Sequence, residues 1–127
     1  MGTMDEPAAN GVLVVEDEAL VRALVAQTLE EAGFSVRQAA EAQGALEMLR
    51  TDDGIRLMVT DVGLPGLNGR RLADAARAQH PDMKVLFMTG YADTTLLEKV
   101  LPAGFGLITK PFALDDLAAQ AHALMAA

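Results

Sequence analysis

Short apolar runs and helix-like segments alternate along this chain from one end to the other. The apolar runs cover residues 11–15, 55–60, 84–88 and 105–109, and Phe34-Ser35-Val36 opens a further strand on an alternating pattern. Apolar residues recur at helical spacing in segments 19–32, 41–50, 70–79, 94–101 and 114–125. Strands that alternate with helices need crossover connections, which favour a parallel sheet covered on both faces. The pattern therefore predicts an α/β fold with five parallel strands and five helices.

The first helix-like segment has its apolar residues at helical spacing. We expect residues 19–32 to bury one apolar face, made of Leu20, Val21, Leu24, Val25, Thr28, Leu29 and Ala32. Gly33 follows directly and is typical of a helix C-cap. Residues 61–69 contain three glycines and one proline, which predicts an irregular loop after the third strand.

Length and composition limit the classes of function. A chain of 127 residues is typical of one domain, which we expect to cover residues 11–127 after a flexible leader at 1–10. The formal net charge of -8 argues against direct binding to nucleic acid. With no cysteine, disulfides, thiolate metal sites and thiol nucleophiles are excluded. No apolar run approaches the roughly 20 residues of a membrane span. The first ten residues do not resemble a secretory signal, so we expect a cytoplasmic protein.

Ionisable and hydroxyl side chains follow four of the five predicted strands. Glu16 and Asp17 follow the first strand, Asp61 the third, Thr89 the fourth and Lys110 the fifth. Parallel strands all end at one edge of the sheet, where functional groups gather in open α/β folds, so we expect these side chains to lie together. Three carboxylates, a hydroxyl and an ammonium on one rim predict a site for a divalent metal ion and a phosphoryl group.

The chemistry of these groups favours that interpretation. Clustered carboxylates repel one another unless a cation joins them. Mg²⁺, or Mn²⁺ in its place, suits the oxygen ligands that Glu16, Asp17 and Asp61 offer. A phosphoryl group on one carboxylate would carry nearly two negative charges and would need neighbouring donors. Lys110 and the Thr89 hydroxyl supply such donors.

Each feature taken alone also has an ordinary structural interpretation. Acids after a strand commonly cap the next helix, and a lysine before a proline is usually exposed. The coincidence of four strand ends with suitable side chains favours the functional interpretation. Gly63 and Gly90 support it, because a residue without a side chain lets backbone N–H groups approach phosphoryl oxygens. His80 and His122 have no partner at ligand spacing, so we expect no metal role for them.

Four motifs give this chain a resemblance to a known family. They are VVEDE at 14–18, VTDVGLPGLNG at 59–69, FMTGYA at 87–92 and ITKPF at 108–112. Each motif alone is weak, but the four occur in the right order and at matching spacing. From residue 11 to residue 125 the chain resembles the receiver domains of two-component response regulators. The amino-acid sequences of its loops are similar to those of receivers attached to hybrid histidine kinases.

The resemblance implies a role for each residue of the predicted site. Asp61 corresponds to the phosphoacceptor, and Glu16 and Asp17 to the acids of the metal site. Thr89 corresponds to the switch hydroxyl and Lys110 to the lysine that contacts the phosphate. Such a protein catalyses only its own phosphotransfer and autodephosphorylation, and it is not a turnover enzyme.

The resemblance also implies structural details and partners. It implies a flavodoxin-like, doubly wound sheet with strand order 2-1-3-4-5. It further implies a metal-contacting carbonyl at Gly63 and often a cis peptide bond before Pro111. The expected phosphodonor is a histidine kinase or a histidine phosphotransfer protein. A downstream protein is expected to bind the face formed by the fourth helix, the fifth strand and the fifth helix.

One position departs from the family pattern. Many receivers have Tyr or Phe three residues before the lysine, whereas this chain has Leu107. Phe105 lies two residues earlier and is expected on the same face of the strand. Because leucine cannot replace the hydrogen bonding or the sweep of an aromatic ring, we expect signalling through the loop after the fourth strand, with Tyr91 as its mobile element.

Two other classes of function remain as alternatives. An aspartyl-phosphate hydrolase of the dehalogenase type also uses Asp, Thr or Ser, and Lys. That class needs a D-x-D nucleophile pair after its first strand, which the sequence Glu16-Asp17-Glu18 does not match. A flavin carrier of the same topology would need a phosphate-binding loop after the first strand, where the three acids would repel the phosphate.

Overall fold

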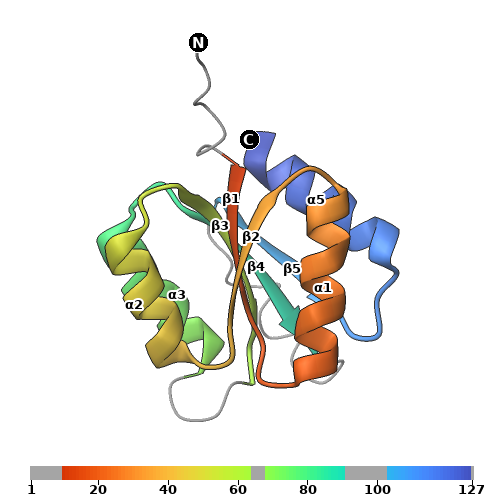
Figure 1. Cartoon of the computed structure of the whole chain (residues 1–127), viewed down its shortest axis with the longest axis horizontal. Helices are drawn as coiled ribbons and strands as arrows, with labels where there is room; N and C mark the ends of the chain where they lie inside the picture. The colour runs from red at the N-terminus through yellow and green to blue at the C-terminus, as the bar shows by residue number, and fades with distance from the viewer. Residues whose placement is uncertain (1–9, 64–67, 91–102, 127) are drawn as a thin grey trace.

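The computed structural model describes residues 10–63, 68–90 and 103–126, which form one five-stranded parallel sheet of order β2-β1-β3-β4-β5 (Figure 1). The strands are β1 (Gly11–Val15), β2 (Ser35–Ala39), β3 (Ile55–Asp61), β4 (Lys84–Thr89) and β5 (Phe105–Thr109). The helices of the described residues are α1 (Ala19–Glu31), α2 (Ala42–Thr51), α3 (Gly69–Gln79) and α5 (Leu114–Ala126). The predicted fold class and strand order are confirmed. The predicted helix at 94–101 lies outside the described residues.

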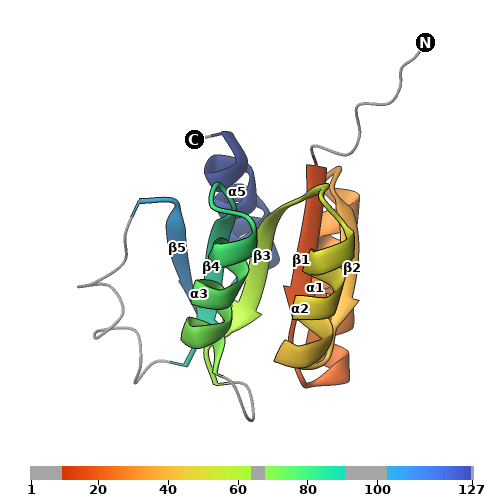
Figure 2. The same cartoon turned by 90° about the vertical axis from the view of Figure 1, so that its left-hand side faces the viewer.

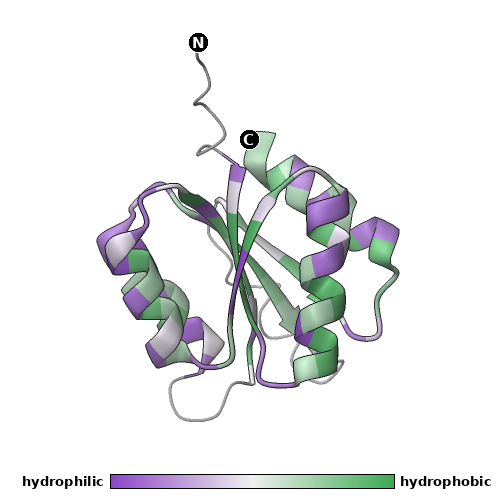
Figure 3. Cartoon of the chain, in the orientation of Figure 1, coloured by the Kyte–Doolittle hydropathy of each residue, from purple (hydrophilic) through white to green (hydrophobic). Residues whose placement is uncertain are grey.

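Helices cover both faces of the sheet, which is seen nearly along its edge in Figure 1. Helices α2 and α3 lie together on one face, and α1 and α5 on the other. Strand β1 serves both layers, because Leu13 and Val15 enter the core beneath α2 and α3, whereas Val12 and Val14 enter the core beneath α1 and α5. Burial on both faces explains why β1 is a continuous apolar run rather than an alternating one. Figure 3 shows this concentration of hydrophobic residues in the central strands.

The buried face of α1 differs from the predicted one. Val25, Ala26 and Leu29 are buried, but Leu20 is 87% exposed and Leu24 is 49% exposed. The physical reason is helical geometry: at about 100° per residue, Leu20 lies roughly half a turn around the helix from Leu29. The predicted apolar face was therefore too wide, and two of its three leucines, Leu20 and Leu24, are exposed.

All five strands run in one direction, so their carboxyl ends lie at one edge of the sheet, the lower edge in Figure 2. The loops after β1 and β3 and the turn after β5 begin at this edge. The C-cap of α1 is Ala32, and Gly33, which was predicted to cap the helix, follows it with a φ of 105°. The peptide bond between Lys110 and Pro111 is cis, as the resemblance implies. In the part of the chain that the structure describes, no helix combines the length and apolar character needed to cross a membrane.

Candidate functional site

The sheet register brings the ends of β1 and β3 side by side. Val15 pairs with Thr60, so the residues that follow them, Glu16 and Asp61, lie next to each other. Carboxylate oxygens of Glu16, Asp17 and Asp61 all lie within 4.8 Å of one another. The fold therefore gathers the three acids that the sequence places after the first and third strands.

Glu16 is a fully buried carboxylate with a hydrogen bond at each oxygen. Its Oε1 accepts a hydrogen bond from Lys110 Nζ at 3.0 Å, and its Oε2 accepts one from the backbone N–H of Glu18 at 3.1 Å. Its own backbone N–H donates to the carbonyl of Ala39 at 3.1 Å. A buried charge is tolerated only when it is paired and hydrogen-bonded in this way.

Asp61 is held from two sides but remains partly open to solvent. Lys110 Nζ donates to Asp61 Oδ2 at 2.8 Å, and the backbone N–H of Gly63 donates to Asp61 Oδ1 at 2.9 Å. The exposed fraction of its side chain is 17%, between buried Glu16 and exposed Asp17. Among the three acids, Asp61 thus combines a fixed orientation with access from outside.

Burial and pairing shift two of these groups in ways that matter for their chemistry. Burial raises the pKa of Glu16, and hydrogen bonds from Glu18 and Lys110 offset only part of that shift. Burial lowers the pKa of Lys110, but its hydrogen bonds to Asp61 and Glu16 and their charges more than compensate, so its pKa is raised overall. Lys110 is therefore a permanent cation between two acids.

Thr89 ends β4 and is buried at the same edge. Its hydroxyl donates to the carbonyl of Gly90 at 3.2 Å, and its carbonyl accepts from the backbone N–H of Lys110 at 2.8 Å. The fold thus places Thr89 one strand from Asp61, with its hydroxyl turned toward the next backbone carbonyl. Tyr91 lies outside the described residues, and Leu107 packs, partly buried, against the core beneath α2 and α3.

The donor set fits a hard divalent cation. Three carboxylates and one ammonium leave this cluster with two excess negative charges, and all the nearby ligand atoms of the acids are oxygens. Asp17 is exposed, so an ion has a path to the cluster. The backbone N–H of Gly63 donates a hydrogen bond to Asp61, whereas the role of the Gly63 carbonyl as a metal ligand stays a prediction.

The chain as a whole matches one known family. The model of the response regulator receiver domain matches residues 12–122. The chain belongs to this family. Receiver domains are signalling modules of two-component phosphorelays. The fold and the acid cluster of this chain therefore belong to a signalling module of this kind. The family match gives no support to the alternative of an aspartyl-phosphate hydrolase.

Individual relatives agree with this assignment. This receiver domain is 39% identical over 110 residues to the sensor kinase CckA of Brucella abortus, covering 84% of this chain but only 12% of the kinase. It is 31% identical to the response regulator receiver protein CpdR of the same species, covering 91% of this chain and 97% of CpdR. A solved response regulator receiver protein from Sinorhizobium medicae is 28% identical and superposes with a TM-score of 0.84, covering 94% of this chain and 96% of that one.

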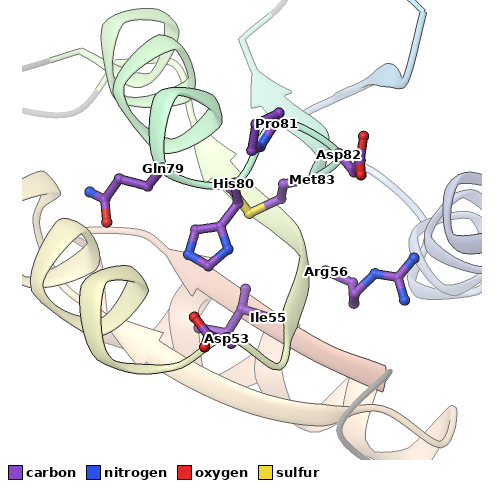
Figure 4. A pocket seen from close by; sticks show the side chains of 8 residues that line it. All are labelled: Asp53, Ile55, Arg56, Gln79, His80, Pro81, Asp82 and Met83. Carbon is purple, nitrogen blue, oxygen red and sulfur yellow. The ribbon is translucent and has the colours of Figure 1, made fainter.

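A second hollow of the receiver domain lies at the opposite edge of the sheet, where β3 and β4 begin (Figure 4). Its lining residues are Asp53, Ile55, Arg56, Gln79, His80, Pro81, Asp82 and Met83. The ring of His80 is hydrogen-bonded through Nε2 to the carbonyl of Leu49 at 2.7 Å. His80 therefore links the ends of α2 and α3, far from the acid cluster.

Sequence reasoning missed two residues that support the site. Arg22 donates from Nη1 to the backbone carbonyl of Glu16 at 2.8 Å. Gly69 lies so close to the end of β3 that an added Cβ would be 2.3 Å from the carbonyl oxygen of Asp61. Arg22 precedes Leu29, a residue of the predicted apolar face, by seven residues, so the helical period indicates its side of α1 but not its contact with Glu16. The close approach of Gly69 has no comparable signal in the sequence.

Proposed function

We propose that Asp61 accepts a phosphoryl group from a phosphohistidine of a histidine kinase or phosphotransfer protein, in a reaction that depends on Mg²⁺ or Mn²⁺. The observation that carries this proposal is the position of Asp61 between Lys110 and the N–H of Gly63, beside two further acids at the open edge of the sheet. This receiver domain is then a protein substrate that switches state, and not a turnover enzyme.

The exposure of the three acids supports Asp61 as the acceptor. Glu16 is fully buried, so a donor cannot reach it, and Asp17 is exposed without a partner that orients it in the described residues. In the proposed reaction an oxygen of the Asp61 carboxylate attacks phosphorus and forms a phosphorus–oxygen bond. The phosphorus–nitrogen bond to the donor imidazole breaks, and its electron pair remains on the imidazole nitrogen.

The metal ion would be held by Glu16, Asp17 and Asp61, with the carbonyl of Gly63 as a further proposed ligand. When bound, the ion supplies positive charge that offsets the phosphoryl oxygens and the acid cluster. Lys110 supplies a second fixed charge, which its raised pKa keeps protonated through the neutral range. Thr89 would report the product by turning its hydroxyl from Gly90 toward the phosphoryl group.

A surface next to the site supports a protein as the donor. An apolar hollow lies beside Lys110 and is lined by Val21, Leu24, Lys110, Pro111, Phe112 and Leu114. The strongly exposed Leu20 lies on the same helix as two of these residues. Exposed leucines around a charged site are typical of a surface that another protein covers.

The route from the site to a downstream partner stays a prediction. We retain the face of the fourth helix, β5 and α5 as its surface, with Tyr91 as the moving element in the absence of an aromatic residue at Leu107. Amide chemical shifts of the beryllofluoride-bound protein test this route. Large shifts on that face that persist in Tyr91→Ala would refute the role of Tyr91. The cytoplasmic location also stays a prediction.

Intact-mass measurement after incubation with acetyl phosphate and Mg²⁺ tests the acceptor. We expect the wild-type protein and Asp74→Asn, a matched loss of one exposed acid on α3, to gain one phosphoryl mass. Asp61→Asn should gain none, and excess chelator should stop the reaction. The proposal is wrong if Asp61→Asn acquires the same adduct, or if the wild-type protein reacts equally well with its metal removed.

A further inference from the structure

Arg22 occupies a position on α1 where an arginine is unexpected. It lies four and seven residues before Ala26 and Leu29, which are both buried, so its side chain starts from the face of α1 that packs on the sheet. It is also in the first turn, where a positive charge is unfavourable for the helix dipole. Neither packing nor helix stability explains an arginine here, whereas its contact with the backbone of Glu16 does.

The side chain of Arg22 reaches back over the loop that carries the acids. Side chains of a helix lean toward its N-terminus, which brings Nη1 within 2.8 Å of the carbonyl oxygen of Glu16, six residues earlier. The carbonyl of Glu16 and the N–H of Asp17 belong to one peptide group. The hydrogen bond from Arg22 therefore fixes the orientation of the peptide from which Asp17 begins.

This contact matters most for Asp17. The Glu16 side chain has its own restraints from Lys110 and Glu18. Asp17 makes no hydrogen bond or ion pair within residues 10–63, 68–90 and 103–126, although its carboxylate belongs to the acid cluster. Its place in the cluster thus depends on the backbone on either side, and Arg22 holds that backbone.

We propose that Arg22 is a positioning residue for the metal site, which keeps the Asp17 carboxylate beside Glu16 and Asp61 in a geometry ready for Mg²⁺. The inference rests on the metal-dependent function proposed above. The change in Mg²⁺ affinity that this role predicts for loss of Arg22 is opposite to the change that charge alone predicts. A nearby guanidinium repels a metal ion, so on charge alone its removal strengthens binding, whereas on positioning its removal weakens binding.

Calorimetric titration with Mg²⁺ separates the two effects. Arg22→Met keeps the aliphatic bulk but removes both the charge and the donor, and we expect it to bind Mg²⁺ about tenfold more weakly, as for other residues that orient metal ligands. Arg22→Lys keeps a charge and a donor and should lose less Mg²⁺ affinity than Arg22→Met. Arg71→Met, which removes an exposed charge on α3, should leave the affinity unchanged.

A second measurement distinguishes positioning from general damage. In phosphorylation by acetyl phosphate, Arg22→Met should need about tenfold more Mg²⁺ for half-maximal rate, while the rate at saturating Mg²⁺ stays close to that of wild type. Circular dichroism checks that each variant is folded. If Arg22→Met is unfolded, Arg22→Ala is measured in its place.

The outcomes for the two proposals are distinct. Unchanged or tighter Mg²⁺ binding by folded Arg22→Met, or an equal loss in Arg22→Lys, overturns the role of Arg22 alone. Failure of the wild-type protein to bind Mg²⁺ or to be phosphorylated on Asp61 overturns the proposed function itself.

Discussion

The ammonium of Lys110 offsets part of the negative charge of the acid cluster. It contacts Glu16 and Asp61 at 3.0 and 2.8 Å, and 29% of its side chain is exposed. Breaking a largely buried pair is costly because the remaining charge loses its partner while it stays desolvated. The residue thus has a structural role that is separable from its proposed contact with a phosphoryl group.

The stability of Lys110→Met should depend on pH in a defined direction. Burial raises the pKa of Glu16 above the value of 4.5 expected in the unfolded chain. The folded state therefore holds this proton more tightly, and the free energy of unfolding falls as pH rises from 4.5 through the folded pKa. Without Lys110 the pKa of Glu16 rises further. We expect a loss of about 2 kcal/mol at pH 7 and a smaller loss near pH 4.

Urea denaturation of the metal-free proteins at both pH values measures this difference. Arg71→Met removes an exposed cation and should show no comparable pH dependence. A loss in Lys110→Met that is equal at the two pH values would show that the pairing with Glu16 does not cause it.

At the scale of elements, the junction between β3 and α3 is the tightest part of the site. The backbone N–H of Gly69 donates to the carbonyl of Val62 at 3.0 Å, and Asn68 caps α3 by accepting from the N–H of Arg71 at 2.9 Å. An added Cβ at Gly69 would lie 2.3 Å from the carbonyl oxygen of Asp61. The first residue of α3 is thus packed directly on the backbone of the proposed acceptor.

Two glycine-to-alanine changes should consequently have opposite effects. Gly69→Ala forces backbone to move at Asp61, and we expect it to lower the free energy of unfolding by more than about 2 kcal/mol and to slow phosphorylation. Gly44→Ala lies within α2, where an added Cβ meets only Ala39 at 4.0 Å. It should raise the free energy of unfolding by about 0.5–1 kcal/mol. Chemical denaturation measures the free energy of unfolding of both variants. An unchanged free energy of unfolding in Gly69→Ala would contradict the close approach of Gly69 to Asp61.

The sequence predicted most elements well because four of the five strands are largely apolar and several boundaries have a physical marker. The exception is β2, which was expected at 34–36 but spans Ser35–Ala39 and is largely exposed. Gly33 has the positive φ expected of a glycine that ends a helix, directly after the C-cap Ala32, and β1 has the continuous burial of a central strand. Side-chain direction around α1 was predicted less well, since an apolar residue such as Leu20 satisfies a loose helical period without facing the sheet. The hydrogen bond of Arg22 and the close packing of Gly69 depend on tertiary distances, which periodicity does not contain.

At the scale of the whole molecule, the proposed metal site should couple ion binding to folding. The acid cluster joins residues from β1–α1 and β3, so only the folded chain presents it. A ligand that binds only the folded state stabilises it, by about 2.7 kcal/mol at a hundred times its Kd. We therefore expect Mg²⁺ to raise the melting temperature of the wild-type protein by several degrees.

Thermal unfolding with increasing MgCl₂ tests this coupling. NaCl at matched ionic strength controls for general screening of the net charge of -8. Asp17→Asn should lose most of the Mg²⁺-dependent rise, while Asp74→Asn should keep it. Equal responses of the two variants would indicate that Mg²⁺ acts on overall charge and not at the cluster.

The strand order gives the two halves of the site unequal mechanical support. Glu16 and Asp61 are anchored at β1 and β3, each of which has a neighbouring strand on both sides, whereas Lys110 follows β5, which pairs with β4 alone among the described strands. Strands at the edge of a sheet open locally at lower free energy than central ones. A displacement of β5 therefore carries the positive charge away from acids that stay in place. Local opening at this edge of the sheet therefore leaves the negative charge of Glu16 and Asp61 less compensated.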